Sequence, residues 1–403
     1  MRTRLFALGA LFAVAGVSAC ASLFGFEELT FSPDASAQAD APTATATEQP
    51  DAAPTCNPER PPERPVGDSG DDTTRLTFVF NDFDLGLQVG GGAAPVRGYD
   101  LDGVCTTKPG EESCANAQGT LAFDDYTRDK TDRGVDNAAY VLLQFFRSSI
   151  IPNAPFRPEQ VSESLKQGTY GFLLDIEGYN GQPEDPTVKV SFRPTLGLTD
   201  GGVPRFDRTE QWLIDDEFAT RDAFGASSIF DFRGYVTGGV LYARFDPFAL
   251  PIQRKRNGNV LKLALKDVVM SAKVERGDGG GYVLTNGVVA GKWPIDEAFK
   301  NARVVAYQET EDVILCAMPF DQAFRDLACK ARDIRIGAGV DVSAPCDAVS
   351  VGFGFTAVEA ASTERLGKRF YRDASCPQVT CSTPAGEGGI PENQGTFPPQ
   401  GDE

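Results

Sequence analysis

Alternating apolar and polar residues dominate the middle of the chain. The clearest segment, 259–275, reads NVLKLALKDVVMSAKVE, and Leu261, Leu263 and Leu265 alternate there with polar or small residues. A repeat of two residues places successive side chains on opposite faces of a β-strand. The phase of the alternation changes after Asp267, which predicts a β-bulge or a corner at that residue.

Several other segments rich in β-branched and aromatic residues also predict strands. These segments are 74–80 (TRLTFVF), 171–176 (GFLLDI), 187–192 (TVKVSF) and 349–357 (VSVGFGFTA). In the last one, Ser, Gly and Thr occupy one face, and such small residues predict close approach of another backbone or of a ligand. Segments 233–245 and 282–290 predict hairpins, around Thr-Gly-Gly and Asn-Gly respectively.

Helical signals are fewer. Asn137 can cap a helix over 138–149, whose apolar residues form one broad stripe. Pro294 and Pro319 each stand where a further helical segment begins. With many strands, frequent turns and few helices, the chain predicts a mainly β fold: an antiparallel β-sandwich or barrel-like body with a few helical insertions.

Composition divides the chain into a body and two low-complexity ends. Residues 32–72 are rich in Ala, Pro, Thr and Asp and nearly free of large apolar side chains, which predicts a disordered tether. Residues 383–403 are rich in Gly, Pro and polar residues and predict a disordered tail. The globular body is therefore expected over 73–382, with a division into two subdomains near 200–210 as a further option.

The first twenty residues have the pattern of an export signal. Arg2 and Arg4 precede an apolar stretch of about a dozen residues. This stretch is too short to span a bilayer, which needs about 20 apolar residues. Small residues and a cysteine follow it, in the sequence VSAC at 17–20.

The VSAC segment resembles the lipobox of bacterial lipoproteins. The resemblance implies a signal peptide over 1–19, cleavage before Cys20 and a diacylglycerol on its thiol, so that 20–72 form a lipid anchor and linker. Ala21, directly after the cysteine, favours the outer membrane under the family's sorting rule. The alternative is a plain secretory signal, cleaved near Ala19 or Ala21, in which Cys20 has no role.

The cysteine count also indicates export. The chain has nine cysteines, and without Cys20 an even number is left, which suits complete pairing in an oxidising compartment. The expected disulfide cysteines are Cys56, Cys105, Cys114, Cys316, Cys329, Cys346, Cys376 and Cys381. Short separations favour Cys105 with Cys114 and Cys376 with Cys381, while Cys56 is expected to fasten the end of the linker to the body. Metal binding is the weaker alternative, because the chain has no CxxC pair and no histidine.

Charge and composition exclude several functions. Asp and Glu total 57 against 38 Lys and Arg, a formal net charge of −19, which argues against a nucleic-acid partner. The absence of histidine excludes Ser-His-Asp and Cys-His catalysis. The Gly-Gly-Gly runs at 90–92 and 279–281 lack the Lys-Ser/Thr of a phosphate loop and predict turns.

Two acidic clusters are candidate sites. Asp215, Asp216 and Glu217 lie close to Trp212, and a pair of carboxylates can hydrolyse a glycoside without histidine. The alternative for this cluster is a solvated polar turn.

The second cluster begins with Asp100 and Asp102, which with Gly103 resemble the opening of a calcium loop. Calcium is the one cofactor that the sequence suggests. Candidates to complete the ligand set are Asp124, Asp125, Asp132 and Asp136. The closing glutamate of an EF-hand is missing, so the alternative is an Asx turn in which these carboxylates accept hydrogen bonds from backbone amides.

The predicted function is that of a lipid-anchored envelope lipoprotein that acts as a non-catalytic binding or structural surface module. Its expected partners are the membrane, through the N-terminal lipid, and a glycan or an envelope protein. Two alternatives are a carboxylate-dependent hydrolase acting on polysaccharide and an accessory subunit of an envelope complex.

Overall fold

The structure is a computed structural model. It describes residues 59–67, 73–85, 97–105, 113–115, 134–140, 142, 158–219, 227–253, 260–305, 314–337, 339–369 and 376–382. The expected signal peptide, Cys20, Cys56 and the tail lie outside the described residues, as do most of the helix over 138–149 and Asp124, Asp125 and Asp132.

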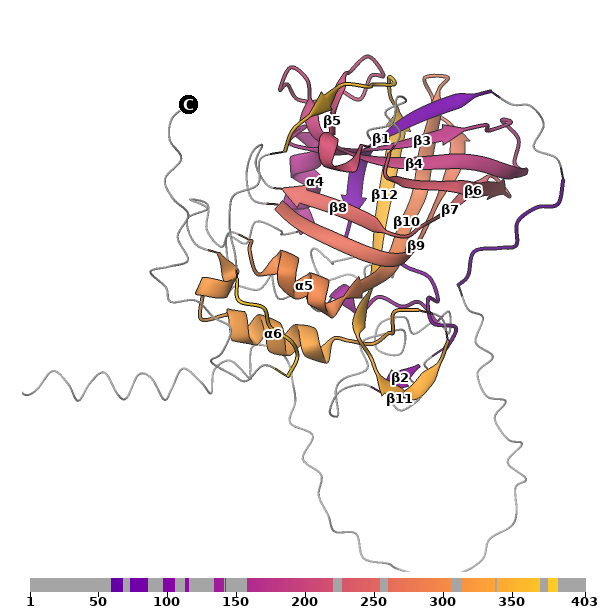
Figure 1. Cartoon of the computed structure of the whole chain (residues 1–403). Helices are drawn as coiled ribbons and strands as arrows, with labels where there is room; N and C mark the ends of the chain where they lie inside the picture. The colour runs from indigo at the N-terminus through magenta and orange to yellow at the C-terminus, as the bar shows by residue number, and fades with distance from the viewer. Residues whose placement is uncertain are drawn as a thin grey trace, which may run out of the picture. The chain divides into compact units, whose positions relative to one another are not determined.

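Eight antiparallel strands form a closed β-barrel (Figure 1). Its strands are β1 (Arg75–Asp84), β3 (Gly171–Glu177), β4 (Asp185–Leu198), β6 (Ile229–Thr237), β7 (Val240–Phe245), β9 (Val260–Arg276), β10 (Tyr282–Pro294) and β12 (Ala348–Glu359). Their order is β4-β3-β1-β12-β10-β9-β7-β6, and β6 pairs with β4 to close the ring. The predicted mainly β class is confirmed, with the barrel rather than the sandwich. Strands β4 and β6, which pair with each other, lie on either side of residues 200–210.

Shorter elements surround the barrel. The additional strands are β2 (Cys114–Ala115), β5 (Trp212–Asp215), β8 (Phe248–Gln253), β11 (Asp341–Pro345) and β13 (Leu366–Gly367). The described helices are α4 (Pro158–Lys166), α5 (Ile295–Ala302) and α6 (Asp321–Lys330), with 3-10 turns η1 (Asp216–Phe218) and η2 (Leu315–Ala317). The helices expected after Pro294 and Pro319 are confirmed as α5 and α6. No described helix has the length and apolarity needed to cross a membrane.

Phenylalanine side chains fill the barrel interior. Phe80 stacks on Phe355 with ring centroids 4.2 Å apart, and Phe172 stacks on Phe192 at 5.5 Å. Each of these four side chains is at most 4 % exposed. An eight-stranded barrel is just wide enough to be filled by side chains, so these rings form the core of the fold.

The alternation in the sequence explains the strand irregularities. Asp267 has a φ of 51° and the β9–β10 register shifts beside it, which confirms the predicted bulge. The β6–β7 hairpin turns at Gly238 and Gly239, as expected. The hairpin expected around Asn286 is wrong. Asn286 adopts a φ of 49° inside β10, where a second register shift lets the strand continue, and the chain reverses earlier, at 277–281.

The small face of β12 is covered by other parts of the chain. The side-chain amide of Asn137 donates to the carbonyl groups of Arg97 and Gly352, at 2.9 and 3.0 Å. The hydroxyl of Ser350 accepts from the amide of Ala138 at 2.8 Å. The prediction of a closely approaching backbone is therefore confirmed.

Three disulfides join distant parts of the chain: Cys114–Cys346, Cys316–Cys376 and Cys329–Cys381. Cys105 is disulfide-bonded as well. The expected Cys105–Cys114 and Cys376–Cys381 pairs are wrong. The fold instead brings Cys114 of β2 beside the end of β11, and it packs 376–382 against η2 and α6. The cysteines therefore pair with partners that are close in space but distant in sequence.

Candidate binding groove on the barrel wall

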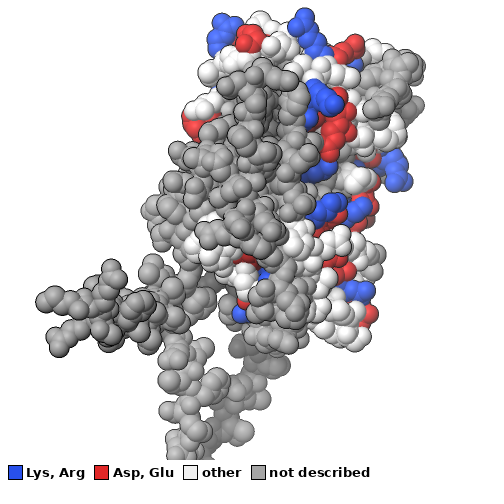
Figure 2. All heavy atoms as spheres, turned by 60° about the vertical axis from the view of Figure 1, so that its left-hand side comes forward, with Lys and Arg blue, Asp and Glu red and all other residues white. Residues whose placement is uncertain are grey.

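A groove of about 820 Å³ lies against the outer wall of the barrel. Strands β6, β7, β9 and β10 contribute to its lining, together with residues 60–61, the loop at 100–103 and the segment 335–339. Five of its lining residues are basic and five are acidic, in a chain whose overall charge is strongly negative. The space-filling view likewise shows Lys/Arg and Asp/Glu side by side over the described surface (Figure 2).

The floor of the groove is formed where β6 and β7 separate. Their register extends from Thr237↔Val240 only to Tyr235↔Tyr242. Beyond that point the Asp231 carboxylate accepts from the backbone amides of Arg233 and Arg244, each at 2.8 Å. The side chain of Asp231 thus provides acceptors that main-chain carbonyl groups would provide in a continuous ladder.

A bulge in β6 turns its side chains outward at the same place. The β4–β6 register steps from Val188↔Gly234 to Val190↔Asp231, so β6 holds one extra residue. Phe230 and Phe232 on this segment are 40 % and 57 % exposed, and their ring centroids lie 4.4 Å apart. Bulges re-aim side chains next to binding and active sites, and this one presents two adjacent aromatic rings to solvent.

The segment 59–67 forms one border of the groove. The amide of Asp100 donates to the Glu59 carbonyl at 2.9 Å, and the hydroxyl of Tyr235 donates to the Pro62 carbonyl at 2.5 Å. Arg64 donates to the carbonyl of Pro186 at 3.0 Å and lies over the Tyr235 ring. Residues 59–67, which the sequence assigned to the linker, are therefore part of the folded body.

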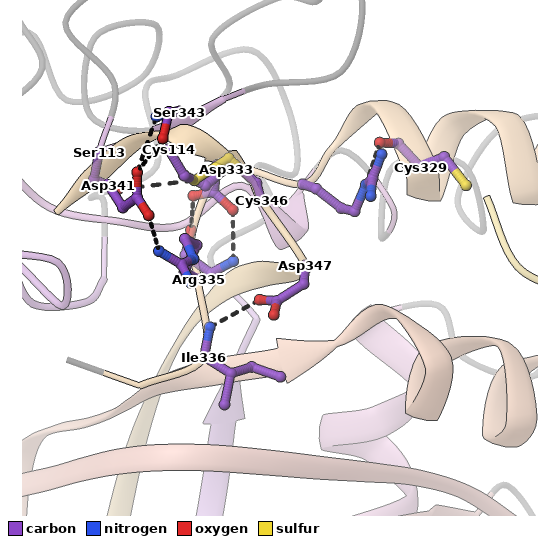
Figure 3. The surroundings of a disulfide bond; sticks show 12 residues. Ser113, Cys114, Cys329, Asp333, Arg335, Ile336, Asp341, Ser343, Cys346 and Asp347 are labelled. Carbon is purple, nitrogen blue, oxygen red and sulfur yellow. Dashed lines mark hydrogen bonds and ion pairs between the residues drawn. A yellow bond between two sulfur atoms is a disulfide. The ribbon is translucent and has the colours of Figure 1, made fainter. Parts of the chain in front are cut away.

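The opposite border is stiffened by a disulfide. Arg335 lies 3.2 Å from the Asp341 carboxylate, and the Ile336 amide donates to Asp347 at 2.8 Å, around the Cys114–Cys346 bond (Figure 3). The Ser343 hydroxyl, which donates to Asp341 at 2.7 Å, holds the pKa of that carboxyl below its ordinary value. Both borders are thus held in place, one by hydrogen bonds and the other by an ion pair and a disulfide.

Every acidic side chain that lines the groove has a donor. The donors are Arg60 for Asp100, the Val104 amide for Asp102, the Arg233 and Arg244 amides for Asp231, Lys266 for Asp246, and Lys292 for Asp267. Arg60, Lys292 and Arg335 are in turn paired with acidic residues. Among the described residues, the exposed guanidinium groups of Arg233 and Arg244 make no hydrogen bond or ion pair. The groove therefore offers a ligand the N–H donors of these two guanidinium groups, whereas its carboxylates are already hydrogen-bonded or ion-paired.

The candidate calcium ligands lie at the edge of the groove. Asp136 joins Asp100 and Asp102, with one carboxylate oxygen of each within 4.8 Å of the others. Asp100 accepts from the Gly103 amide at 2.6 Å and from Arg60 Nε at 2.7 Å. The Leu101 amide donates to Asp136 at 2.6 Å. The bond from the Gly103 amide is that of the Asx-turn alternative, and the Arg60 guanidinium supplies the positive charge beside Asp100.

The second acidic cluster, at Asp215, is split by burial. Asp215 is completely buried and accepts from Arg369 Nε at 2.5 Å, while burial raises the pKa of its carboxyl. Asp216 is exposed, and Glu217 pairs with Lys262 at 2.5 Å. Trp212 is buried as well. Asp215 therefore anchors η1 by accepting from the Glu217 amide and cannot meet a substrate from solvent.

The groove residues Phe230, Asp231, Arg233 and Arg244 were missed from the sequence. The segment IFDFRGY carries the only available signal, because large aromatic residues there alternate with charged ones and both sets cannot be buried. The point at which β6 and β7 separate cannot be predicted from the local alternation of apolar and polar residues.

Comparisons with protein-family models, with curated proteins and with solved structures each found no match. The fold and the groove therefore define this protein only as a closed, disulfide-bonded β-barrel with a charged and aromatic surface groove.

Proposed function

We propose that this protein is an exported, lipid-anchored envelope protein whose barrel is a non-catalytic binding module. The observation that carries the binding role is the groove. Its carboxylates are held by donors, whereas two arginines and two phenylalanines are presented to solvent. Such a surface is suited to holding a ligand, since phenylalanine and arginine are both enriched in protein interfaces.

The export part of the proposal is supported by the cysteines. Disulfides persist in oxidising compartments, and the described part of the chain holds three long-range ones. Together with the VSAC segment they favour export and a lipid on Cys20. Anchoring in the outer membrane is the more specific proposal, carried by Ala21.

The anchor is tested by labelling with a fatty acid and by membrane fractionation. We expect the wild-type chain to be labelled and to be found in the outer-membrane fraction. The Cys20→Ser variant should carry no label and should be absent from that fraction. The matched control is Cys56→Ser, which removes a cysteine but keeps the lipobox, and which should stay labelled. An unmodified N-terminal peptide beginning at Cys20 would overturn the anchor.

The binding role is tested with the full chain in mild detergent, immobilised and exposed to isolated envelope fractions. We expect retention of at least one component, and its loss in the double variant Arg233→Gln/Arg244→Gln. Release of new reducing ends from a retained polysaccharide would instead identify the hydrolase. No retention by the wild-type chain would overturn the binding module.

A further inference from the structure

We infer that the groove binds an extended, acidic polypeptide segment of another envelope protein, one that carries apolar side chains between its carboxylates. This inference rests on the proposed binding role and specifies the ligand. It follows from three properties of the groove: its free donors, its apolar surface and the rigidity of its frame.

The unpaired guanidinium groups of Arg233 and Arg244 favour a ligand that carries carboxylates. The Asp231 carboxylate binds the amides of both Arg233 and Arg244, which places the two arginines beside each other on adjacent strands. Both side chains are exposed. A planar guanidinium presents two parallel N–H groups that match a carboxylate. Two adjacent arginines can therefore receive two carboxylates of one extended chain.

The apolar surface selects a polypeptide over a sugar chain. The exposed rings are those of Phe230 and Phe232, and both tryptophans are buried. Tyr235 and Tyr242 stack on each other, and Arg64 lies over the Tyr235 ring. Sugar-binding platforms usually use exposed Trp or Tyr, whereas Phe and Arg are both enriched in protein interfaces.

The rigid frame suits an extended ligand. The segment 59–67 is bonded to the barrel on one side, and the Cys114–Cys346 disulfide holds the other side. A groove with fixed borders binds without the ordering penalty of closing a loop. The negative charge of the whole chain opposes an acidic partner at long range, so the affinity should be moderate.

The test uses the full chain in mild detergent and a fluorescein-labelled short peptide rich in glutamate and leucine, followed by fluorescence anisotropy. Two matched peptides replace glutamate by glutamine or leucine by serine. We expect saturable binding of the first peptide, weakened about tenfold or more by either replacement. Arg233→Gln/Arg244→Gln and Phe230→Ser/Phe232→Ser should each weaken it to a similar extent.

The control variants are Arg205→Gln and Lys300→Gln, which remove exposed cations that do not line the groove. These should bind as the wild type does, and near-identical circular dichroism of all variants will show that they are folded. Equal binding by the Arg233→Gln/Arg244→Gln variant would overturn the inference. If polygalacturonate binds better than the peptide, and this binding depends on Arg233 and Arg244, the ligand is an acidic glycan and not a polypeptide. The proposed binding module would then stand, and the inference about its ligand would be wrong.

Discussion

The main-chain carbonyl oxygen of Arg97 lies 1.9 Å from the position that a Cβ atom on Gly352 would occupy. Segment 97–105 thus lies directly on the outer face of β12, and Gly352 makes this contact feasible. The same segment carries Asp100 to the groove, so the glycine indirectly positions one of its borders.

We expect Gly352→Ala to lower the free energy of unfolding by about 2–3 kcal/mol, because the methyl group must displace a backbone segment. The matched control is Gly354→Ala, whose Cβ would meet Arg97 Nε at 3.1 Å and Asp84 Cβ at 3.3 Å, contacts that need shifts of only a few tenths of an ångström. Urea unfolding of both variants measures the difference. Equal stability of the two variants would mean that 97–105 does not pack on β12.

This contact shows what sequence alone could reveal. The alternation of Ser and Gly with Val and Phe on β12 depends only on local spacing, and it predicted a close neighbour correctly. The identity of that neighbour depends on a segment about 250 residues earlier in the chain, which no local pattern encodes. The groove was out of reach for a related reason, because it arises where two paired strands diverge.

The disulfide pairing likewise depends on contacts between distant segments, which the cysteine spacing does not predict. Non-reducing peptide mapping should yield Cys114 linked to Cys346, Cys316 to Cys376 and Cys329 to Cys381. With Cys20 acylated, Cys56 is the remaining partner for Cys105, and a peptide joining these two is expected. Recovery of a Cys105–Cys114 or a Cys376–Cys381 peptide would contradict the structure. Replacing both Cys114 and Cys346 by Ser should destabilise the fold by about 2–5 kcal/mol.

A buried ion pair holds the helical part of the body together. Asp321 accepts from Arg303 at 2.6 and 2.9 Å, Arg325 lies 3.3 Å away, and all three side chains are at most 5 % exposed. We expect Asp321→Ala to lower the free energy of unfolding by about 3–5 kcal/mol, since two buried cations lose their counter-charge. Asp326→Ala, at an exposed position of the same helix, should change it by less than about 0.5 kcal/mol. Thermal or urea unfolding measures both, and a similar loss in the two variants would contradict the role of the pair.

Asp341 gives a prediction about pH. The hydrogen bonds from Ser343 lower the pKa of its carboxyl in the folded protein below the ordinary value of 3.8. The stabilisation from these bonds is therefore present above pH 3.8 and is lost as the pH falls through the lowered pKa. NMR titration of the Asp341 carboxyl should give a midpoint below that of an unfolded control. Ser343→Ala should raise this midpoint, and an unchanged midpoint would show that the bonds do not act on the charged form.

We expect calcium and Arg60 to compete for the Asp100 carboxylate. Arg60 Nη2 lies 2.6 Å from Asp100, inside the cluster formed with Asp102 and Asp136. We therefore expect millimolar calcium to leave the thermal midpoint of the wild-type protein unchanged. In Arg60→Gln the carboxylates repel one another without a cation between them, so the midpoint should fall by a few degrees and then rise with calcium concentration.

Arg64→Gln is the matched control for this competition, because Arg64 donates to the carbonyl groups of Pro186 and Arg233 and not to a carboxylate. Its midpoint should not respond to calcium. If the wild-type midpoint itself rises with calcium, and Asp102→Asn abolishes the rise, calcium displaces Arg60 and the loop is a metal site. If Arg60→Gln also fails to respond, the three aspartates serve only as acceptors for backbone amides, and the alternative of an Asx turn accounts for the whole cluster.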